Sequence, residues 1–135
     1  MASIFTKIIK GEIPSYKIAE DEHCYAFLDI NPLAKGHTLV VPKKEIDYLF
    51  DVEDEIYRKL FTFSKQVAKA IEKVIPCERV GIAVLGLEVP HAHIHLIPIN
   101  SIYDIEFSRP KLKLSEEEFE DIASRIRQEY EKINQ

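Results

Sequence analysis

The sequence predicts an α+β domain in which helices pack on one antiparallel sheet of about five strands. Two long amphipathic patterns, over residues 52–75 and 115–133, indicate helices. Short apolar runs bounded by turn residues precede and separate these helices, as is typical of strands. The loops between successive runs are short, which favours antiparallel pairing because parallel strands need long crossovers. No linker rich in Gly, Pro or Ser divides the chain, so residues 1–135 are predicted to form a single domain.

The N-terminal third begins with a short helix and continues with three strands. Apolar residues recur at helical spacing over residues 3–10, where Ser3 is a suitable N-cap and Gly11 a suitable end. The three strands that follow are predicted at residues 16–19, 24–28 and 37–42.

The strongest helical pattern covers residues 52–75. Its apolar residues recur every three or four positions, and Pro76 prevents the helix from continuing. Two further strands are predicted at residues 80–85 and 89–99, with Gly86 between them. The apolar stripe of the helix consists of Ile56, Leu60, Phe63, Val67, Ile71 and Val74.

The last helix has a clear beginning. Ser115 and Glu118 have the spacing of a capping box, in which each side chain bonds the backbone of the other residue. One side of this helix is apolar and is predicted to pack on the domain through Phe119, Ile122, Ile126 and Ile133.

Charge and composition exclude several classes of protein. The formal net charge of −5 argues against a general nucleic-acid binder, which would present a basic face. No apolar run approaches the roughly 18 residues of a membrane span, and the N-terminus lacks the apolar core of a secretory signal. We therefore expect a cytoplasmic protein with no nucleic-acid or membrane partner. Cys24 and Cys77 lie far apart and are expected to be reduced thiols.

Three of the five histidines, His91, His93 and His95, alternate within the stretch HAHIHLI. On a strand they would share one face, with neighbouring imidazoles roughly 6–7 Å apart. Because the ordinary pKa of histidine is near neutrality, such a row can hold both a nucleophile and proton donors. The row therefore predicts a catalytic site rather than three structural histidines. The residues between and after them, which would face the core, are Ala92, Ile94 and Leu96.

A metal site is the main alternative, because His-x-His pairs are ordinary metal ligands. The whole row would span roughly 13 Å, which is too far for three ligands of one ion unless the strand bends. A site on His91 and His93 would need a third ligand, for which His37 and Glu88 are the candidates.

Residues 91–97 match the pattern His-φ-His-φ-His-φ-φ, where φ is apolar, and so resemble the signature of the histidine triad (HIT) superfamily. Two other parts resemble the same superfamily in the same order. Residues 4–14 resemble its opening helix, and residues 26–32 and 36–43 resemble its nucleoside-binding strands. The resemblance implies a HIT-like version of the α+β fold.

The resemblance covers residues 3–98 and leaves the extension from about residue 100 to 135 without an assigned role. Members of the superfamily are commonly homodimers, so the resemblance also implies a homodimer, with the 52–75 helix and a sheet edge at the interface. Tyr57 and Phe61 widen the apolar arc of that helix, which is compatible with such an interface and equally with burial of the helix in the domain's own core.

The chemistry implied by the resemblance is hydrolysis or transfer of a purine nucleotide at its α-phosphate, through a nucleotidyl-histidine intermediate. His93, the middle histidine, would attack the phosphorus. His91 and His95 would orient it and hold phosphate oxygens, and His37 matches a further histidine near the family's site. A neutral imidazole is a competent nucleophile, and splitting one displacement into two lowers each barrier. This scheme requires no metal and no cofactor.

The resemblance also implies a nucleoside pocket. Asp29 matches the acidic residue that binds the ribose hydroxyls, a task suited to a carboxylate that accepts two hydrogen bonds. Taken singly, Asp29 and Asn31 are ordinary turn residues, and the apolar positions are ordinary core residues. The other positions assigned to the pocket are Phe5, Ile8, Ile13, Phe27, Leu28, Ile30, Asn31, Glu88 and Val89.

Three features depart from the family pattern. Ser3 and Thr6 stand where some members carry a zinc-binding Cys-x-x-Cys, so no structural zinc is expected. Leu87 and Glu88 stand where the phosphoramidase branch has Gln and then Ser or Thr. A carboxylate at Glu88 that faced the site would repel a phosphate unless it were protonated or paired. Finally, Ile99 replaces the arginine that often follows the proline after the triad.

These features leave two functions open. The first is an enzyme that acts on a nucleoside phosphoramidate or a dinucleoside polyphosphate. The second is a catalytically weak nucleotide- or partner-binding module, for which Leu87 and Glu88 are the motivation.

Overall fold

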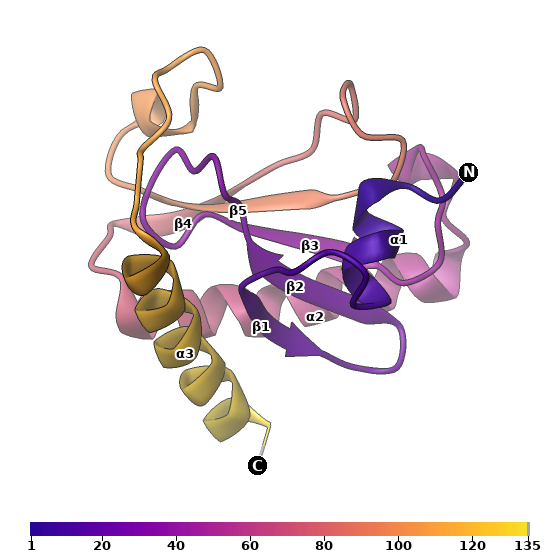
Figure 1. Cartoon of the computed structure of the whole chain (residues 1–135), viewed down its shortest axis with the longest axis horizontal. Coiled ribbons are helices and arrows are strands. Elements are labelled where there is room, and N and C mark those ends of the chain that lie inside the picture. Colours follow the sequence, from indigo (N-terminus) through magenta and orange to yellow (C-terminus); the bar gives the residue numbers. More distant parts are fainter. Residues whose placement is uncertain (135) are drawn as a thin grey trace.

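A computed structural model describes residues 1–134 and confirms the predicted fold class (Figure 1). The strands are β1 (Lys17–Glu20), β2 (Cys24–Leu28), β3 (Thr38–Pro42), β4 (Arg79–Ala83) and β5 (Ile94–Ile99). The helices are α1 (Ile4–Ile9), α2 (Asp54–Val74) and α3 (Glu116–Ile133), with short 3-10 turns η1 (Leu49–Asp51) and η2 (Ile102–Ile105). The five strands form one sheet in the order β1-β2-β3-β5-β4, and all neighbouring pairs are antiparallel.

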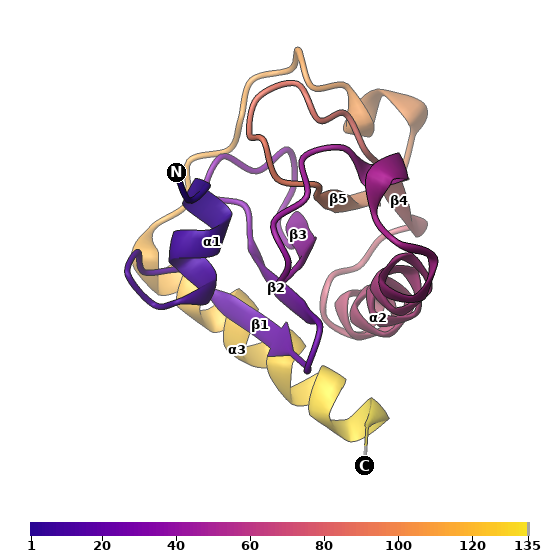
Figure 2. The same ribbon diagram turned by 90° about the vertical axis from the view of Figure 1, so that its right-hand side faces the viewer.

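The sheet separates two clusters of buried side chains, because successive residues of a strand point to opposite faces. In β2, Ala26 belongs to the larger cluster and Phe27 to the smaller one. In β3, Val40 belongs to the larger cluster and Leu39 to the smaller one. Figures 1 and 2 show α2 and α3 below the strands and the long β4–β5 and β5–α3 connections above them.

The larger cluster lies between the sheet and the two long helices. The predicted stripe of α2 is buried in it, except for the partly buried Ile56. In α3 the predicted capping box of Ser115 and Glu118 is present. The prediction for Ile133 was wrong: this side chain is 42% exposed, because the last turn of α3 projects past the sheet (Figure 2). The residues of α3 that do pack on the core are Phe119, Ile122, Ala123 and Ile126.

The smaller cluster lies beneath α1 on the opposite face of the sheet. The Ser3 hydroxyl caps α1 as predicted, and Gly11, with a φ of +79°, follows its end. Phe5 and Ile8 of α1 pack with Phe27 and the other buried residues of this cluster. One side of the cluster is open and forms the wall of a cavity.

The strand that carries the histidines begins later than predicted. The apolar pattern indicated a strand over residues 89–99, but β5 begins at Ile94. Pro90 has no N–H to donate to a ladder. The carbonyl of Pro42, at the end of β3, lies 2.8 Å from a ring nitrogen of His91 and so bonds a side chain instead of a facing strand.

Side chains nevertheless alternate between the two faces of the sheet in the residues just before β5 as well. Ala92 donates its backbone N–H to the carbonyl of Ile46 at 2.7 Å, which holds this segment in place of a ladder. Ala92, Ile94 and Leu96 all belong to the larger cluster, as predicted. The other boundaries shift by one or two residues, so that predicted segments 16–19, 37–42, 52–75 and 80–85 become Lys17–Glu20, Thr38–Pro42, Asp54–Val74 and Arg79–Ala83.

No helix within residues 1–134 combines the length and apolar character that crossing a membrane requires. The two cysteines are free thiols, and burial in β2 raises the pKa of Cys24 to about 12.

Candidate active site

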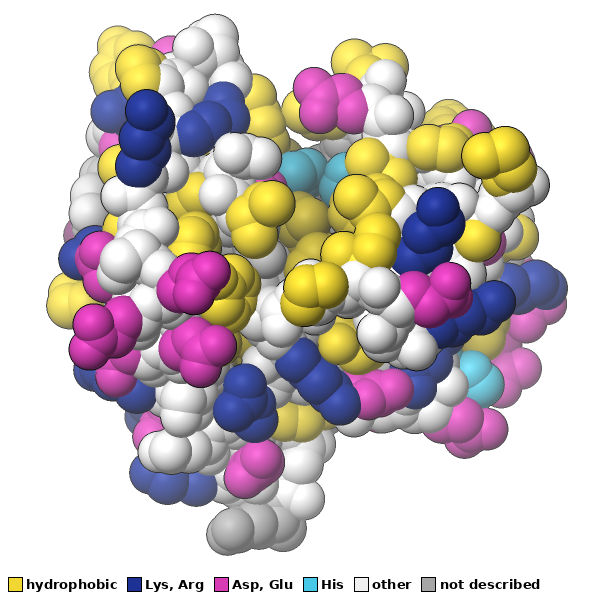
Figure 3. Space-filling model, in the orientation of Figure 1, with side chains coloured by type: hydrophobic (Ala, Val, Ile, Leu, Met, Phe, Trp, Pro, Cys, Tyr) yellow, Lys and Arg dark blue, Asp and Glu magenta, His cyan; other side chains and the backbone are white. Residues whose placement is uncertain are grey.

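A cavity of about 430 Å³ opens on the face of the sheet that carries α1. Figure 3 shows a hollow with histidine side chains at its floor and hydrophobic side chains around it. A volume of this order is typical of small-ligand sites.

The cavity brings together most of the residues that the sequence assigned to a site. His37, His93 and His95 line it, whereas His91 does not. All the assigned nucleoside positions line it: Phe5, Ile8, Ile13, Phe27, Leu28, Asp29, Ile30, Asn31, Glu88 and Val89.

Aromatic rings form a continuous row across the cavity. The distances between ring centroids are 5.5 Å from Phe27 to Phe5, 5.0 Å from Phe5 to His93, 5.1 Å from His93 to His95, and 4.7 Å from His95 to Phe107. The two histidines are closer than ideal strand spacing predicts, because His93 precedes the regular part of β5.

The partners of His93 determine which of its ring nitrogens can react. Nδ1 lies 2.7 Å from the carbonyl oxygen of His91, and since a carbonyl only accepts, Nδ1 carries the proton. In the neutral ring the lone pair is then on Nε2. No side chain or backbone group within residues 1–134 forms a hydrogen bond with that nitrogen. His93 therefore offers a nucleophilic nitrogen to the cavity.

A second chain of hydrogen bonds sets the protons of His37 and His95. The backbone N–H of Leu33 donates to Nδ1 of His37 at 3.0 Å, so the proton of a neutral His37 is on Nε2. That Nε2 lies 3.0 Å from Nδ1 of His95 and donates to it, which leaves the His95 proton on Nε2. Burial lowers the pKa of His37 to about 3 and that of His95 to about 4, so both rings are neutral at neutral pH.

His91 is held by the start of α1 instead of facing the cavity. Its Nε2 donates to the carbonyl of Pro42 at 2.8 Å, and its Nδ1 accepts from the Ser3 hydroxyl at 2.7 Å. Glu45 completes this group of residues, accepting hydrogen bonds at 2.6 Å from the backbone N–H of Ser3 and from the hydroxyl of Thr6. These bonds lower the pKa of Glu45 to about 2. His91 thus meets His93 through its carbonyl, and its ring joins α1 to the histidine segment.

Asp29 lies beside the histidines at the end of β2. Its Oδ1 accepts the backbone N–H of Asn31 at 2.8 Å, and its Oδ2 lies 3.5 Å from Nε2 of His37. Because His37 is neutral at neutral pH, the second contact is not an ion pair there. Burial raises the pKa of Asp29. The carboxylate retains acceptor capacity toward the cavity, as binding to hydroxyl groups requires.

Of the metal ligands considered from the sequence (His91, His93, His37 and Glu88), His37 alone belongs to the group of side chains within residues 1–134 that could hold a metal ion. Both ring nitrogens of His91 have protein partners, so a site on His91 and His93 is not assembled. Ligand atoms of Asp29, His37 and His95 do lie within 4.8 Å of one another. A proton already joins His37 to His95, and a metal ion would have to displace it.

Several lining residues were missed from the sequence. Leu39 pairs directly with His95 between β3 and β5, so the register would have placed it on the same face. Phe107 and Lys111 lie in the β5–α3 connection, where no periodicity or motif marks them. The other missed residues are Ile4, Pro14, Ser15, Leu85, Gly86 and Leu87.

Residues 10–102 match the HIT domain. The chain belongs to the HIT family. A HIT-like protein of Borreliella burgdorferi is 37% identical over 131 residues, which cover 91% of this chain and 94% of that protein. The adenosine 5'-monophosphoramidase hnt1 of Schizosaccharomyces pombe is 37% identical over 134 residues, which cover 94% of this chain and 100% of that protein. A HIT-like protein of Bartonella henselae, described as involved in cell-cycle regulation, has a TM-score of 0.81 at 32% identity, covering 94% of this chain and 95% of that one.

The family match confirms the resemblance seen in the sequence and accounts for the position of the three alternating histidines. It ends at residue 102. The part of the HIT fold that this match covers therefore includes the histidines and Asp29, whereas Phe107 and Lys111 reach the cavity from outside it.

Proposed function

We propose that this HIT protein is a purine-nucleotide hydrolase or transferase that acts at the α-phosphate through a nucleotidyl intermediate on His93. The observation that carries this proposal is the His93 ring, whose Nδ1 proton is fixed on the His91 carbonyl while Nε2 faces the cavity. The S. pombe relative, named as an adenosine 5'-monophosphoramidase, supports the same class of reaction.

In this proposal the apolar end of the cavity binds the purine. Phe5, Ile8 and Phe27 belong to the smaller buried cluster and also line the cavity, so they present an apolar surface already fixed by packing. Asp29 would accept hydrogen bonds from the ribose hydroxyls. The α-phosphate would then lie at His93, between the nucleoside end and His95.

The first chemical step forms a bond from Nε2 of His93 to the phosphorus. The bond from phosphorus to the leaving group breaks, and the leaving group takes the electron pair. An amine also takes a proton from water and leaves as a neutral molecule, whereas a phosphate group leaves as an anion. Positive charge that develops on the His93 ring is stabilised by the hydrogen bond from Nδ1 to the His91 carbonyl. The Nε2 proton of His95 is available to a phosphate oxygen. In the second step the oxygen of a water molecule bonds to phosphorus and loses a proton to the solvent. The bond from phosphorus to Nε2 breaks, its electron pair returns to Nε2, and a nucleoside monophosphate is released.

A rapid-quench experiment tests the proposal. The protein is mixed with adenosine 5'-phosphoramidate, quenched within seconds and weighed intact, beside His93→Ala and a control, His23→Ala, which changes a histidine outside the cavity. We expect an adenylyl-sized mass increase and release of adenosine monophosphate from the wild type and the control only. Equal product release by His93→Ala would contradict the proposal.

The same measurement distinguishes the binding-module alternative. Glu88 is exposed and lines the cavity, where its carboxylate repels phosphate. If wild type binds adenosine monophosphate but gives neither adduct nor product, the protein is a binding module. Glu88→Ser would then be the variant with which to look for restored turnover.

We also propose that the protein is a homodimer joined through the β4 edge. β4 pairs with β5 alone and leaves the other edge of the strand free within residues 1–134, and free edges favour pairing with another strand. Ile82, Leu85 and Leu87 on and beside this edge are 54%, 52% and 88% exposed. Light scattering of the wild type should give a mass of twice the 15.6 kDa of one chain. The Ile82→Lys variant should give the mass of a single chain. A monomeric wild type would contradict the proposal.

A further inference from the structure

Charge is unevenly distributed around the cavity. Among the lining side chains within residues 1–134, Asp29 and Glu88 are acidic, and Lys111 is the one lysine or arginine. His37 and His95 contribute no charge at neutral pH, because burial lowers their pKa to about 3 and about 4. A substrate with several phosphates would therefore find its one fixed cation at Lys111.

The local structure holds Lys111 at the cavity. Its Nζ donates hydrogen bonds to the carbonyl oxygens of Phe107 and Arg109, the latter at 3.0 Å. The next residue, Leu112, donates its backbone N–H to the carbonyl of Pro32 at 2.8 Å, which ties this segment to the β2–β3 loop. An ammonium group has three donors, so one remains for a ligand.

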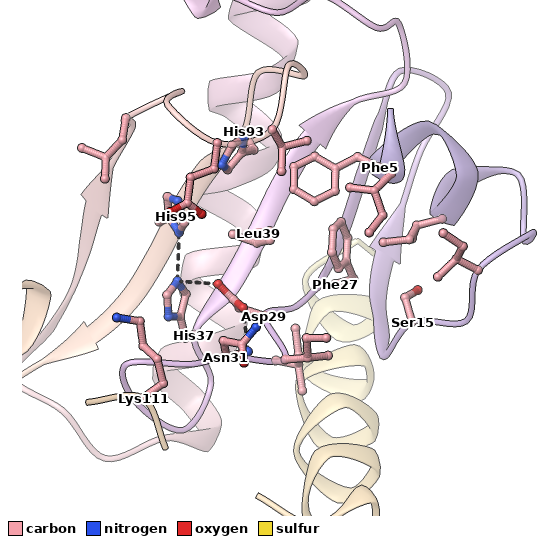
Figure 4. Close-up of a pocket in the computed structure, with 18 of the residues that line it drawn as sticks. Phe5, Ser15, Phe27, Asp29, Asn31, His37, Leu39, His93, His95 and Lys111 are labelled. Atoms are coloured by element: carbon pink, nitrogen blue, oxygen red, sulfur yellow. Dashed lines mark hydrogen bonds and ion pairs between the residues drawn. The ribbon is translucent and has the colours of Figure 1, made fainter. Parts of the chain in front are cut away.

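The row of aromatic rings places this segment relative to the nucleophile. Phe107 lies edge-on to His95, at the opposite end of the row from Phe5 and Phe27. Figure 4 shows the same order, with the two phenylalanines at one side, the histidines in the middle and Lys111 at the other side. A nucleotide whose base lies on Phe5 would direct the group beyond its α-phosphate to the remaining wall.

We propose that Phe107 and Lys111 form the leaving-group end of the site, where Lys111 binds a negatively charged group attached to the α-phosphate. The favoured substrates are then nucleotides whose α-phosphate carries further phosphates, such as dinucleoside polyphosphates, over simple phosphoramidates. This inference rests on the proposed function, because it assumes that the nucleoside occupies the Phe5 end. Glu88 disfavours the other exit for such a group, past the β4–β5 loop, by like-charge repulsion.

Two substrates with different leaving groups test the inference. We compare kcat/KM for diadenosine tetraphosphate, which loses an anion, with that for adenosine 5'-phosphoramidate, which loses ammonia. Lys111→Gln should lower the first value about tenfold, as expected for one lost charge-assisted hydrogen bond, and the second by less than about twofold. The matched control is Lys113→Gln, which changes an exposed lysine of the same segment that does not line the cavity.

Two further readouts separate a charge effect from local disorder of the segment. Lys111→Arg keeps the cation and should retain most of the preference for diadenosine tetraphosphate. Added salt screens an exposed charge, so it should lower the wild-type preference and affect Lys111→Gln less. An equal loss on both substrates, or none on either, would overturn the inference while leaving the His93 mechanism intact.

Binding measurements keep the test decisive if no turnover is seen. In that case the proposed function fails, and the ratio of the dissociation constants for adenosine triphosphate and adenosine monophosphate is measured instead. Lys111→Gln should weaken triphosphate binding about tenfold more than monophosphate binding. A ratio that does not change would overturn the role of Lys111 independently of catalysis.

Discussion

The two faces of the sheet are built from the same strands but bury different chemistry. Between the sheet and the helices α2 and α3, the cluster consists of apolar side chains, of which Leu60, Phe63 and Ile71 are at most 1% exposed. On the α1 face, His37, His91, His93 and His95 are each at most 8% exposed. These rings can be buried because their nitrogens form hydrogen bonds with one another, with backbone groups and with the Ser3 hydroxyl. The face under α2 and α3 therefore stabilises the domain, while the α1 face fixes which ring nitrogens of the buried histidines carry protons.

Matched phenylalanine truncations provide the strongest test of this comparison. Phe63, 1% exposed in the larger cluster, packs against the ring of Tyr130 at 5.7 Å, and Phe63→Ala should cost about 3–5 kcal/mol of unfolding free energy. Phe5 borders the cavity, so Phe5→Ala should cost less stability but raise KM for the nucleotide about tenfold. Urea denaturation and steady-state kinetics measure both effects. Equal destabilisation with no change in KM would remove the distinction between the two faces.

Acid pH should destabilise the protein through the histidine face. The pKa values of His37 and His95 are depressed to about 3 and about 4, below the value of about 6.5 in an unfolded chain. The unfolded state therefore binds more protons as pH falls below about 6.5. The stability that these rings contribute is complete above that pH and is lost as pH falls through 4 toward 3.

Denaturant titrations at several pH values measure this dependence. His95→Gln should flatten the decline between pH 6.5 and 4, whereas His23→Gln, outside the cavity, should leave it as steep as in the wild type. A wild-type stability that does not change over this range would contradict buried neutral histidines.

Asp29 should affect substrate binding more than folding. Asp29→Asn removes the negative charge but retains a carbonyl acceptor, and should lower kcat/KM for a ribonucleotide about ten- to a hundredfold. A substrate lacking both ribose hydroxyls should be affected much less, because it has no partner for the carboxylate. The control, Asp47→Asn, changes an exposed acid outside the cavity. An equal loss on both substrates would show that Asp29 acts on the fold or on His37 instead.

The comparison of faces also shows which features were predictable from the sequence. The α2 stripe and the Ser115 capping box were predicted because each depends on local spacing. The alternation of Ala92, Ile94 and Leu96 was predicted for the same reason, although the regular strand begins later. The nucleoside positions came from resemblance to a family, since an apolar residue such as Phe27 has the same local pattern whether or not it borders a cavity.

What could not be predicted depends on contacts between distant segments. The orientation of His91 depends on Ser3 and Glu45, which lie far from it in the sequence and meet it through α1. Phe107 and Lys111 lie in an irregular connection, where neither strand nor helix spacing indicates which way a side chain points. Such contacts are fixed by the packing of whole elements and leave no periodic signal.

Replacing the two serines that cap helices has the smallest expected effect and distinguishes the two faces most selectively. Ser3 and Ser115 both cap helices through a side-chain oxygen, so replacing either by alanine should cost about 1 kcal/mol of stability. The Ser3 hydroxyl also donates to Nδ1 of His91 at 2.7 Å, and the His91 carbonyl holds the proton of His93. Ser3→Ala should therefore lower kcat a few-fold with little change in KM, while Ser115→Ala leaves both unchanged. If the two variants lose equal stability and neither loses activity, the hydrogen bonds from α1 to His91 stabilise the helix without positioning the nucleophile.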